Sequence, residues 1–481
     1  MYHSHLPDQP KKRVLTVAPL PPEKAAYALA RYSRSPDSIR DSIEWVRTHD
    51  SRKFLESFYF QYGHASIADL GHVTLCFEGV SEIAAVEIED EQLWDGQARS
   101  SRYQDFGRSG FVTPPEFDAA QAALYQAAGE KLLAAYQETH AAMAGYLSEK
   151  LPRPESMKPD AYQRNIAARA FDVARYLLFF GVPTGVGQVT SIRTLEKQIR
   201  KMKASELAEV RELGAEAAAA CAETPACLWS GDGEPVAPTL AKYVEADEHI
   251  ARSREDLALW ARQNLPTAAG AAVDEVDLLK PADTECDVVA TLLYSVTDRP
   301  YRELYETASG WPDERRAEVI DTALRSRSRR DELMSAFRGG PYVYDMVMDI
   351  GAYRDLHRHR RCQQFRQRYG RALGFDVPRA VSEAGIEGPF RAALEGAFAA
   401  AALLPEPAAA YLLPFATRAR FLFKMDFAEA EYIARLRSGV KGHFSYREIA
   451  WKMKERMARL EPSLGRLMSA TPPEIEDPLQ R

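Results

Sequence analysis

The sequence of 481 residues predicts an α+β protein made of two homologous domains. A chain of this length exceeds what one ordinary hydrophobic core holds, so two domains are expected. The same order of extended and helical segments occurs twice, on either side of a connector rich in Ala, Pro and acidic residues. We place the N-terminal domain at 1–225, the connector at 226–269 and the C-terminal domain at 270–481.

The repeated order is read from hydrophobic periodicity and strand-like composition. In the N-terminal half, the segments are an extended stretch at 72–80, a helix from Ser81, a polar stretch at 97–104, an apolar stretch at 174–183, and helices at 192–202 and 208–213. Their counterparts in the C-terminal half are 341–348, a basic helical run, 366–369, 410–414, 427–437 and 446–453. We interpret the repeat as a diverged internal duplication, in which an Ala-rich helix over 119–149 accounts for the extra length of the first half.

Bulk composition excludes several protein classes. Hydrophobic residues make up 46% and charged residues 27% of the chain, which are globular values. No apolar run approaches the length of a membrane span, and the polar start of the chain lacks a secretory signal core, so we expect a protein of the reducing cytoplasm. Five Cys form no C-x-x-C pair, which argues against a zinc site and against a disulfide framework. Cys362 is expected to be a buried, inert thiol.

A basic run at 353–369 is the most informative feature of the sequence. It carries six Arg, two His and a single acid, Asp355, in a chain whose formal net charge is −7. Arg side chains match the geometry of phosphate, so the run predicts an anion site. If the run is helical, Arg354, Arg358 and Arg361 share one face. The alternative is a surface helix whose Arg pair with acids elsewhere. Nucleic-acid binding is disfavoured by the sequence pI of about 5.9.

The motifs together resemble the flavin-dependent thymidylate synthase family. That family has an Arg-His-Arg triplet, a downstream Ser-x-Arg, an upstream Gly-His-x-Ser-x-x-Glu block and a later helix ending in Leu-Arg. The C-terminal half has the triplet at 358–360 and the helix end at 434–437. The N-terminal half has Gly-His-Ala-Ser at 63–66, with Asp69 following, and Ser-Ser-Arg-Tyr at 100–103. The resemblance implies that each domain is a helix-flanked antiparallel sheet.

Each half lacks part of the signature. In the N-terminal half, Asp90, Glu91 and Gln92 stand where the family has Arg-His-Arg, and Met202 stands where it has the downstream Arg. The C-terminal half lacks the Gly-His-x-Ser block, and Arg366 stands about where the family's Ser belongs. Because the defects are complementary, we expect one class of composite site between the domains to survive and the other to have decayed.

The resemblance assigns roles to ten residues. Substrate nucleotide binding and activation fall to Ser100, Arg102, Arg358 and Arg437. Flavin contacts fall to His64, Ser66, Asp69, Arg193, His359 and Arg360. No metal is expected. Taken without the resemblance, these residues have ordinary alternatives: a core His64, a helix cap by Ser66 or Asp69, a solvated turn at Ser100 and Arg102, and surface ion pairs of Arg193 or Arg437 with acids such as Glu196 or Glu431.

The implied activity is FAD-dependent methylation of dUMP to dTMP. Methylenetetrahydrofolate would supply the carbon, non-covalent FAD the hydride, and NADPH the reducing equivalents, with no protein nucleophile. A nucleotide and a folate are then the ligands, with neither nucleic acid nor membrane as a partner, and a homodimer of this chain would mimic the family's homotetramer. The alternatives are a related flavoenzyme for another pyrimidine nucleotide and a non-catalytic nucleotide-binding homologue with decayed sites.

Overall fold

The computed structural model forms two compact units that do not coincide with the two sequence halves. It describes residues 20–33, 35, 39–56, 65–91, 93–101, 106, 110–223, 238–242, 244, 275–279, 283–294, 301–324, 333, 337, 342–477 and 479. Unit 1 comprises the described parts of Met1–Ser101, Pro114–Glu116 and Pro183–Thr267, and unit 2 comprises those of Arg102–Thr113, Phe117–Val182 and Ala268–Arg481. The predicted boundaries therefore stay a prediction about homology, and most of the connector lies outside the described residues.

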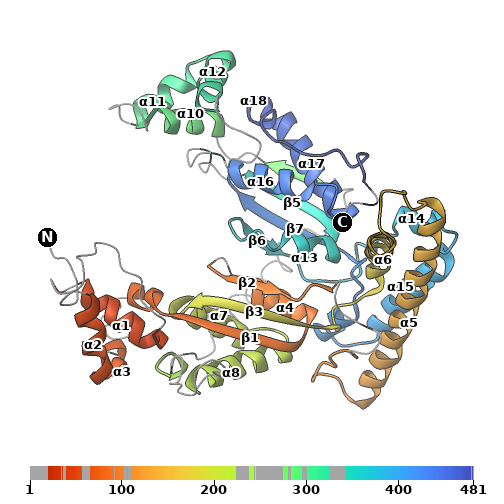
Figure 1. The fold of residues 1–481 in the computed structure, drawn as a ribbon, viewed down its shortest axis with the longest axis horizontal. Helices are drawn as coiled ribbons and strands as arrows, with labels where there is room; N and C mark the ends of the chain where they lie inside the picture. The colour runs from red at the N-terminus through yellow and green to blue at the C-terminus, as the bar shows by residue number, and fades with distance from the viewer. Residues whose placement is uncertain are drawn as a thin grey trace, which may run out of the picture. The chain divides into compact units, whose positions relative to one another are not determined.

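Unit 1 is built around an antiparallel sheet with the strand order β1-β3-β2. Its strands are β1 (His72–Ser81), β2 (Asp95–Ala98) and β3 (Pro183–Ser191). Its main helices are α1 (Pro22–Tyr32), α2 (Ile39–Thr48), α3 (Ser51–Leu55), α4 (Glu82–Glu89), α7 (Ile192–Lys203) and α8 (Ala208–Ala222), with the short 3-10 helix η2 (Ala65–Leu70). Figure 1 shows α7 and α8 running side by side next to the sheet.

Unit 2 contains a second antiparallel sheet with the order β4-β5-β7-β6. Its strands are β4 (Val276–Leu279), β5 (Tyr342–Asp349), β6 (Gln363–Arg366) and β7 (Arg418–Met425). The helices α13 (Ile350–Leu356), α16 (Phe427–Arg437), α17 (Phe444–Leu460) and α18 (Pro462–Gly465) belong to it, as do α10 (Thr284–Tyr294), α11 (Tyr301–Ser309) and α12 (Asp313–Leu324). The predicted strand at 341–348 is confirmed as β5 and the helix at 427–437 as α16, and the helix predicted at 446–453 lies inside the longer α17.

A helical layer completes unit 2. It consists of α5 (Ala119–Lys150), α6 (Pro159–Ala174), α14 (Arg379–Glu383) and α15 (Glu387–Ala401), and Figure 1 shows α5 beside α15. The predicted Ala-rich helix is thus confirmed as α5, which begins with a capping box between Asp118 and Gln121. The matching apolar segments at 174–183 and 410–414 pair with one another in this unit, through Gly181 N to Tyr411 O at 2.8 Å and Phe180 N to Leu413 O at 3.2 Å.

The two sheets share an order of elements. In each, a long strand ends at a residue that caps a short helix, and a short strand follows the cap after the same number of residues. The caps are Ser81 before α4 and Asp349 before α13. A third strand then leads into a helix capped by Ser191 in unit 1 and by Asp426 in unit 2. Mixed α and β structure with antiparallel sheets is therefore confirmed, and the shared order of elements is what a diverged duplication predicts.

Candidate functional site

The site is built on the short helix α13 of unit 2. Its cap, Asp349, is buried and accepts hydrogen bonds from Ala352 N at 2.7 Å, Tyr176 Oη at 3.2 Å and Ser445 Oγ. Burial raises the pKa of the Asp349 carboxyl, while these donors act in the opposite direction. Tyr353 in α13 stacks on Phe421 of β7 with ring centroids 3.9 Å apart. The helix is consequently anchored at its cap and along the sheet.

The helix ends at Leu356, so the expected helical face of Arg354, Arg358 and Arg361 does not form. The chain instead turns through 357–362 before β6. Gln364 clamps this turn, because its Nε2 donates to the carbonyl of His359 at 2.9 Å and its Oε1 lies 3.0 Å from His357 Nδ1. Sequence periodicity missed this ending because the arginines continue past it at helical spacing.

Asp355 lies among four guanidinium groups. Arg175 Nη1 is 3.3 Å from Asp355 Oδ2, and the side chain of Arg175 is almost fully buried. Burial alone would raise the pKa of the Asp355 carboxyl, but the cations hold that pKa below its ordinary value. The four residues are Arg175, Arg358, Arg437 and Arg354. Four guanidiniums act electrostatically on one carboxylate here, and Arg175 is in direct contact with it. A site of this composition suits an anion. We call Asp355 and these residues the arginine cluster.

Arg437 of the cluster is held by a buried histidine. Its Nε donates to His359 Nε2 at 2.7 Å, and His359 Nδ1 lies 3.3 Å from Glu429 Oε1. Burial lowers the pKa of His359, and Arg437 and Arg360 lower it further, against the opposing effect of Glu429. The imidazole is therefore neutral at pH 7. The expected alternative for Arg437, a pair with Glu431, is not found, since Glu431 pairs with Arg435 at 3.2 Å.

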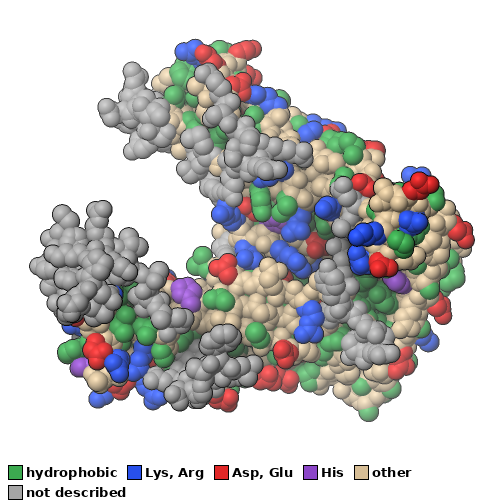
Figure 2. All heavy atoms as spheres, viewed as in Figure 1, with side chains coloured by type: hydrophobic (Ala, Val, Ile, Leu, Met, Phe, Trp, Pro, Cys, Tyr) green, Lys and Arg blue, Asp and Glu red, His purple; other side chains and the backbone are tan. Residues whose placement is uncertain are grey.

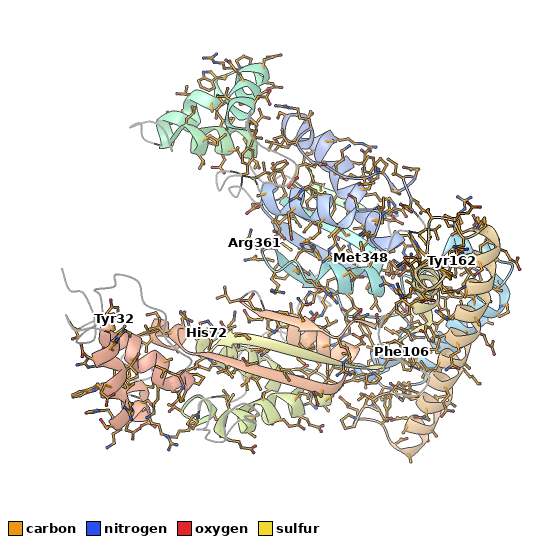
Figure 3. The ribbon with its side chains drawn as sticks, viewed as in Figure 1. Tyr32, His72, Phe106, Tyr162, Met348 and Arg361 are labelled. Carbon is orange, nitrogen blue, oxygen red and sulfur yellow. The ribbon has the colours of Figure 1, made fainter. Side chains whose placement is uncertain are left out.

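The triplet arginines lie around this arrangement. The Arg358 side chain is exposed, and no described residue accepts a hydrogen bond from it, while Arg360 is half-buried beside His359. Arg361 points outward from the turn, as Figure 3 shows. Figure 2 shows Lys and Arg side chains gathered over α13 and β6 on the face in view. Cys362 is a buried thiol that donates to the carbonyl of His359 at 3.0 Å, and burial raises its pKa to about 12, as an inert thiol requires.

The predicted site residues of the N-terminal half are in a different situation. Asp69 and Arg193 form an ion pair at 3.0 Å that is about half exposed, and Asp69 also accepts from Ser191 Oγ at 3.3 Å. Ser66 is exposed on η2, and Ser100 is half-buried just beyond β2. Arg193 thus forms a surface ion pair, with Asp69 in place of the expected Glu196. The roles assigned to these residues stay predictions. His64 and Arg102 lie outside the described residues.

The acids that replace the triplet in unit 1 are internally paired. Lys201 Nζ lies 2.6 Å from Asp90 Oδ2 and donates to the Asp90 carbonyl at 2.8 Å. Lys197 Nζ lies 3.6 Å from Glu91 Oε1. Both lysines come from α7, whose Met202 is buried. The third position, Gln92, lies outside the described residues. Asp90 and Glu91 are thereby neutralised within the unit.

Sequence reasoning missed three residues of the site: Arg175, Asp355 and Glu429. Asp355 stood out as the sole acid of the basic run, and that was the available signal. Arg175 lay inside a segment recognised for its apolar pattern, and Glu429 lay in a helix recognised for its pattern and its Leu-Arg end. No group of three or more His, Cys, Asp or Glu suited to a metal ion occurs in the described ranges, and no helix there has the length and apolar character needed to cross a membrane.

The chain is similar to one protein family and to several known proteins. The family model described as thymidylate synthase complementing protein matches residues 15–224 and 276–463. A UPF0159 protein of Chlamydia muridarum is 26% identical over 433 residues, covering 86% of this chain and 79% of that protein. A UPF0159 protein of Thermoplasma acidophilum is 24% identical over 489 residues, covering 91% and 93%. The crystal structure of a UMP/dUMP methylase from Streptomyces cacaoi bound with 5-Br dUMP aligns over 40% of this chain and 92% of its own, with 18% identity and a TM-score of 0.33. Because the family model covers most of the sequence, this chain belongs to the thymidylate synthase complementing protein family.

Proposed function

We propose that the chain methylates dUMP to dTMP in an FAD-dependent reaction with methylenetetrahydrofolate and NADPH. The observation that carries the proposal is the arginine cluster: four guanidiniums around one carboxylate, with one of them oriented by a neutral histidine. Family membership supports the reaction class. The cluster supports the substrate class, since it suits the phosphate of a nucleotide.

The charge balance favours a phosphate ligand over a carboxylate. Asp355 already takes one positive charge by pairing with Arg175. Arg358 and Arg437 remain as donors, because no described residue accepts a hydrogen bond from Arg358 or from the two terminal nitrogens of Arg437. Two guanidiniums that both act on Asp355 attract a dianion, and each presents paired N–H groups that fit phosphate oxygens. In the proposed reaction they bind the dUMP phosphate and polarise the uracil carbonyls.

The residues fit a flavin only in part. Arg360 is half-buried at the edge of the cluster and suits a flavin phosphate. The ring of His359 is only 5% exposed and uses both nitrogens within the protein, so it does not fit a polar flavin contact. When bound, the flavin supplies hydride chemistry that no side chain offers. The chain's own contribution is to bind and orient the substrate and to hold charge at fixed positions.

The remaining parts of the proposal rest on the resemblance. Ser66, Asp69 and Arg193 would contribute flavin contacts, and Ser100 would hydrogen-bond the nucleotide, at composite sites of the two homologous halves. His64 and Arg102 have the same standing. A homodimer of this chain and a cytoplasmic location complete the proposal.

The test has a spectroscopic and a chemical part. The purified full-length protein is mixed with FAD and dUMP, desalted, and examined by visible absorbance for retained flavin bands that dUMP perturbs. It is then incubated with dUMP, methylenetetrahydrofolate and NADPH, and chromatography is used to measure dTMP. We expect retained flavin and dTMP formation, and we expect Arg358→Ala to lower dTMP formation and the perturbation of the flavin bands by dUMP. A 5-methyl product from another pyrimidine nucleotide alone would favour the related flavoenzyme, and nucleotide binding without flavin would favour the non-catalytic homologue.

A further inference from the structure

We propose that Glu429 is a positioning residue of the arginine cluster: it fixes the orientation of His359, which in turn holds the guanidinium of Arg437 for the substrate. This inference rests on the proposed function in one respect, the identity of the ligand as a pyrimidine nucleotide. The residues form one continuous hydrogen-bonded path, Glu429 to His359 to Arg437.

The path connects two residues of one helix through a turn. Glu429 lies in the first turn of α16, where its backbone N–H donates to Asp426 Oδ1 at 2.8 Å, and Arg437 is the last residue of the helix. The carboxylate is 3% exposed, so it is shielded from solvent. His359 projects from the turn after α13 and bridges the two ends of α16. Tyr432, also on α16, meets the imidazole edge-on with centroids 5.6 Å apart.

The hydrogen-bond chemistry fixes the tautomer. Arginine only donates, so His359 Nε2 must accept from Arg437 Nε and carries no proton. The single proton of the neutral ring is then on Nδ1, where it donates to the Glu429 carboxylate. Burial, Arg437 and Arg360 all oppose a second proton on this ring, whereas Glu429 favours one. The carboxylate therefore selects the only tautomer that accepts from Arg437.

The consequence for Arg437 is orientation. Its Nε is used by the histidine, which leaves both terminal nitrogens as a pair for a ligand. The ring of Tyr446 lies 5.6 Å from its Cζ on one side. Without Glu429, His359 can place its proton on Nε2, and two donors then face one another. Arg437 moves away from that position, and the bidentate geometry is lost.

The corresponding helix of unit 1 has neither residue. Counted from the helix cap, Thr194 occupies the position of Glu429, and Met202 occupies the position of Arg437. The unit that lacks the arginine thus also lacks the carboxylate. If the fold itself required an acid at this position of the helix, unit 1 would also have one there.

The first part of the test measures dUMP affinity by titration calorimetry with the full-length protein. Glu429→Leu removes the acceptor, and we expect the dissociation constant to rise about 10- to 100-fold, as for a lost charge-assisted hydrogen bond. In an Arg437→Gln background the same substitution should add no more than about twofold. If Glu429→Leu lowers dUMP affinity by the same factor in the wild type and in Arg437→Gln, or lowers it in neither, the proposal is overturned. Glu431→Leu is the matched control, since Glu431 is a buried acid of the same helix that pairs with Arg435, and it should leave dUMP affinity unchanged.

The second part needs no ligand, so it separates this proposal from the proposed function. ¹⁵N spectra of histidine-labelled protein report the tautomer of His359, assigned with His359→Gln. We expect the Nδ1–H form in the wild type and in Glu431→Leu, and its loss in Glu429→Leu. If dUMP does not bind but the tautomer responds in this way, the positioning stands and the substrate assignment fails. If the tautomer is unchanged in Glu429→Leu, the positioning role is wrong whatever the substrate.

Discussion

The two strand–helix–strand elements, β1-α4-β2 in unit 1 and β5-α13-β6 in unit 2, use the same geometry with opposite chemistry. At the cap, Ser81 donates through Oγ to Glu209 Oε2 at 2.5 Å, whereas Asp349 accepts from the Ser445 hydroxyl. Glu209 lies at the start of α8, the helix after α7, and Ser445 lies at the start of α17, the helix after α16. A hydroxyl and a carboxylate have thus exchanged places between the units, and each pair remains satisfied.

At the other end of the helix the exchange is not neutral. Unit 2 places Arg358 and His359 after α13, and unit 1 places Asp90 and Glu91 after α4. The acids are paired by Lys201 and Lys197, whereas no described residue takes a hydrogen bond from Arg358. The comparison teaches that the cap is a structural pair that both units keep in kind, while the turn is where one unit retains a surplus of charge and the other has balanced it.

The largest expected effect comes from placing a carboxylate at the cap of unit 1 while the carboxylate of Glu209 is still present. Ser81→Asp would bury a carboxylate against Glu209, whose oxygens lie 2.9 Å and 2.5 Å from Ser81 N and Oγ. Two uncompensated carboxylates at a buried site should lower the free energy of unfolding by about 3–5 kcal/mol. Adding Glu209→Ser recreates the arrangement of unit 2 and should recover more than half of the loss. Denaturant titration, with hydrogen exchange of the amides at 82–89 as a local readout, measures both. A double variant no more stable than Ser81→Asp would refute the exchange.

Much of this comparison was visible in the sequence. The strands β1 and β5, the helices α7, α16 and α17, the Ala-rich α5 and the replacement of the triplet by Asp90 and Glu91 follow from hydrophobic patterns and motif positions. The strands β3 and β7, each paired on both sides in its sheet, were not predicted. The end of α13 was not predicted, because it is set by tertiary contacts of Gln364 rather than by a breaker residue. Arg175 was missed for a related reason: its partner Asp355 is far away in the sequence, and only the fold brings the two within 3.3 Å.

A second, smaller effect distinguishes the two turns. A substitution in the turn of unit 2 should change dUMP affinity, and one that affects the turn of unit 1 should change the free energy of unfolding. Arg358→Ala should raise the dissociation constant for dUMP about 10- to 100-fold, because a phosphate donor is lost, and should change stability by less than about 0.5 kcal/mol. Lys201→Ala should leave dUMP affinity unchanged and lower the free energy of unfolding by about 1–2 kcal/mol, because Asp90 loses its partner in a half-buried setting. Calorimetric titration and denaturant unfolding of both variants give the four numbers. A loss of dUMP affinity in Lys201→Ala would mean that the turn of unit 1 also takes part in binding.

The smallest effect is a pH dependence that only unit 2 should show. The native pKa of His359 lies below its ordinary value near 6.5, with burial as the main cause and with Glu429, Arg437, Arg360 and the ring of Tyr432 facing the imidazole. Between the native and the unfolded pKa of His359, the unfolded chain binds more protons than the native one, so stability rises with pH in that window. The contribution is complete above about pH 6.5 and is lost as pH falls toward the native pKa. It amounts to about 1.4 kcal/mol for every tenfold difference in proton affinity between the unfolded and the native imidazole.

The measurement is the free energy of unfolding without ligand from pH 5 to 8, compared between the wild type and His359→Gln. The free energy of unfolding should fall more steeply on acidification in the wild type. Only the wild type has a ring at position 359 that binds a second proton more weakly in the native state than in the unfolded chain. Parallel curves would show that the imidazole takes up its second proton as readily in the native state as in the unfolded chain. The proposal that a neutral His359 accepts from Arg437 and thereby orients it would then be wrong.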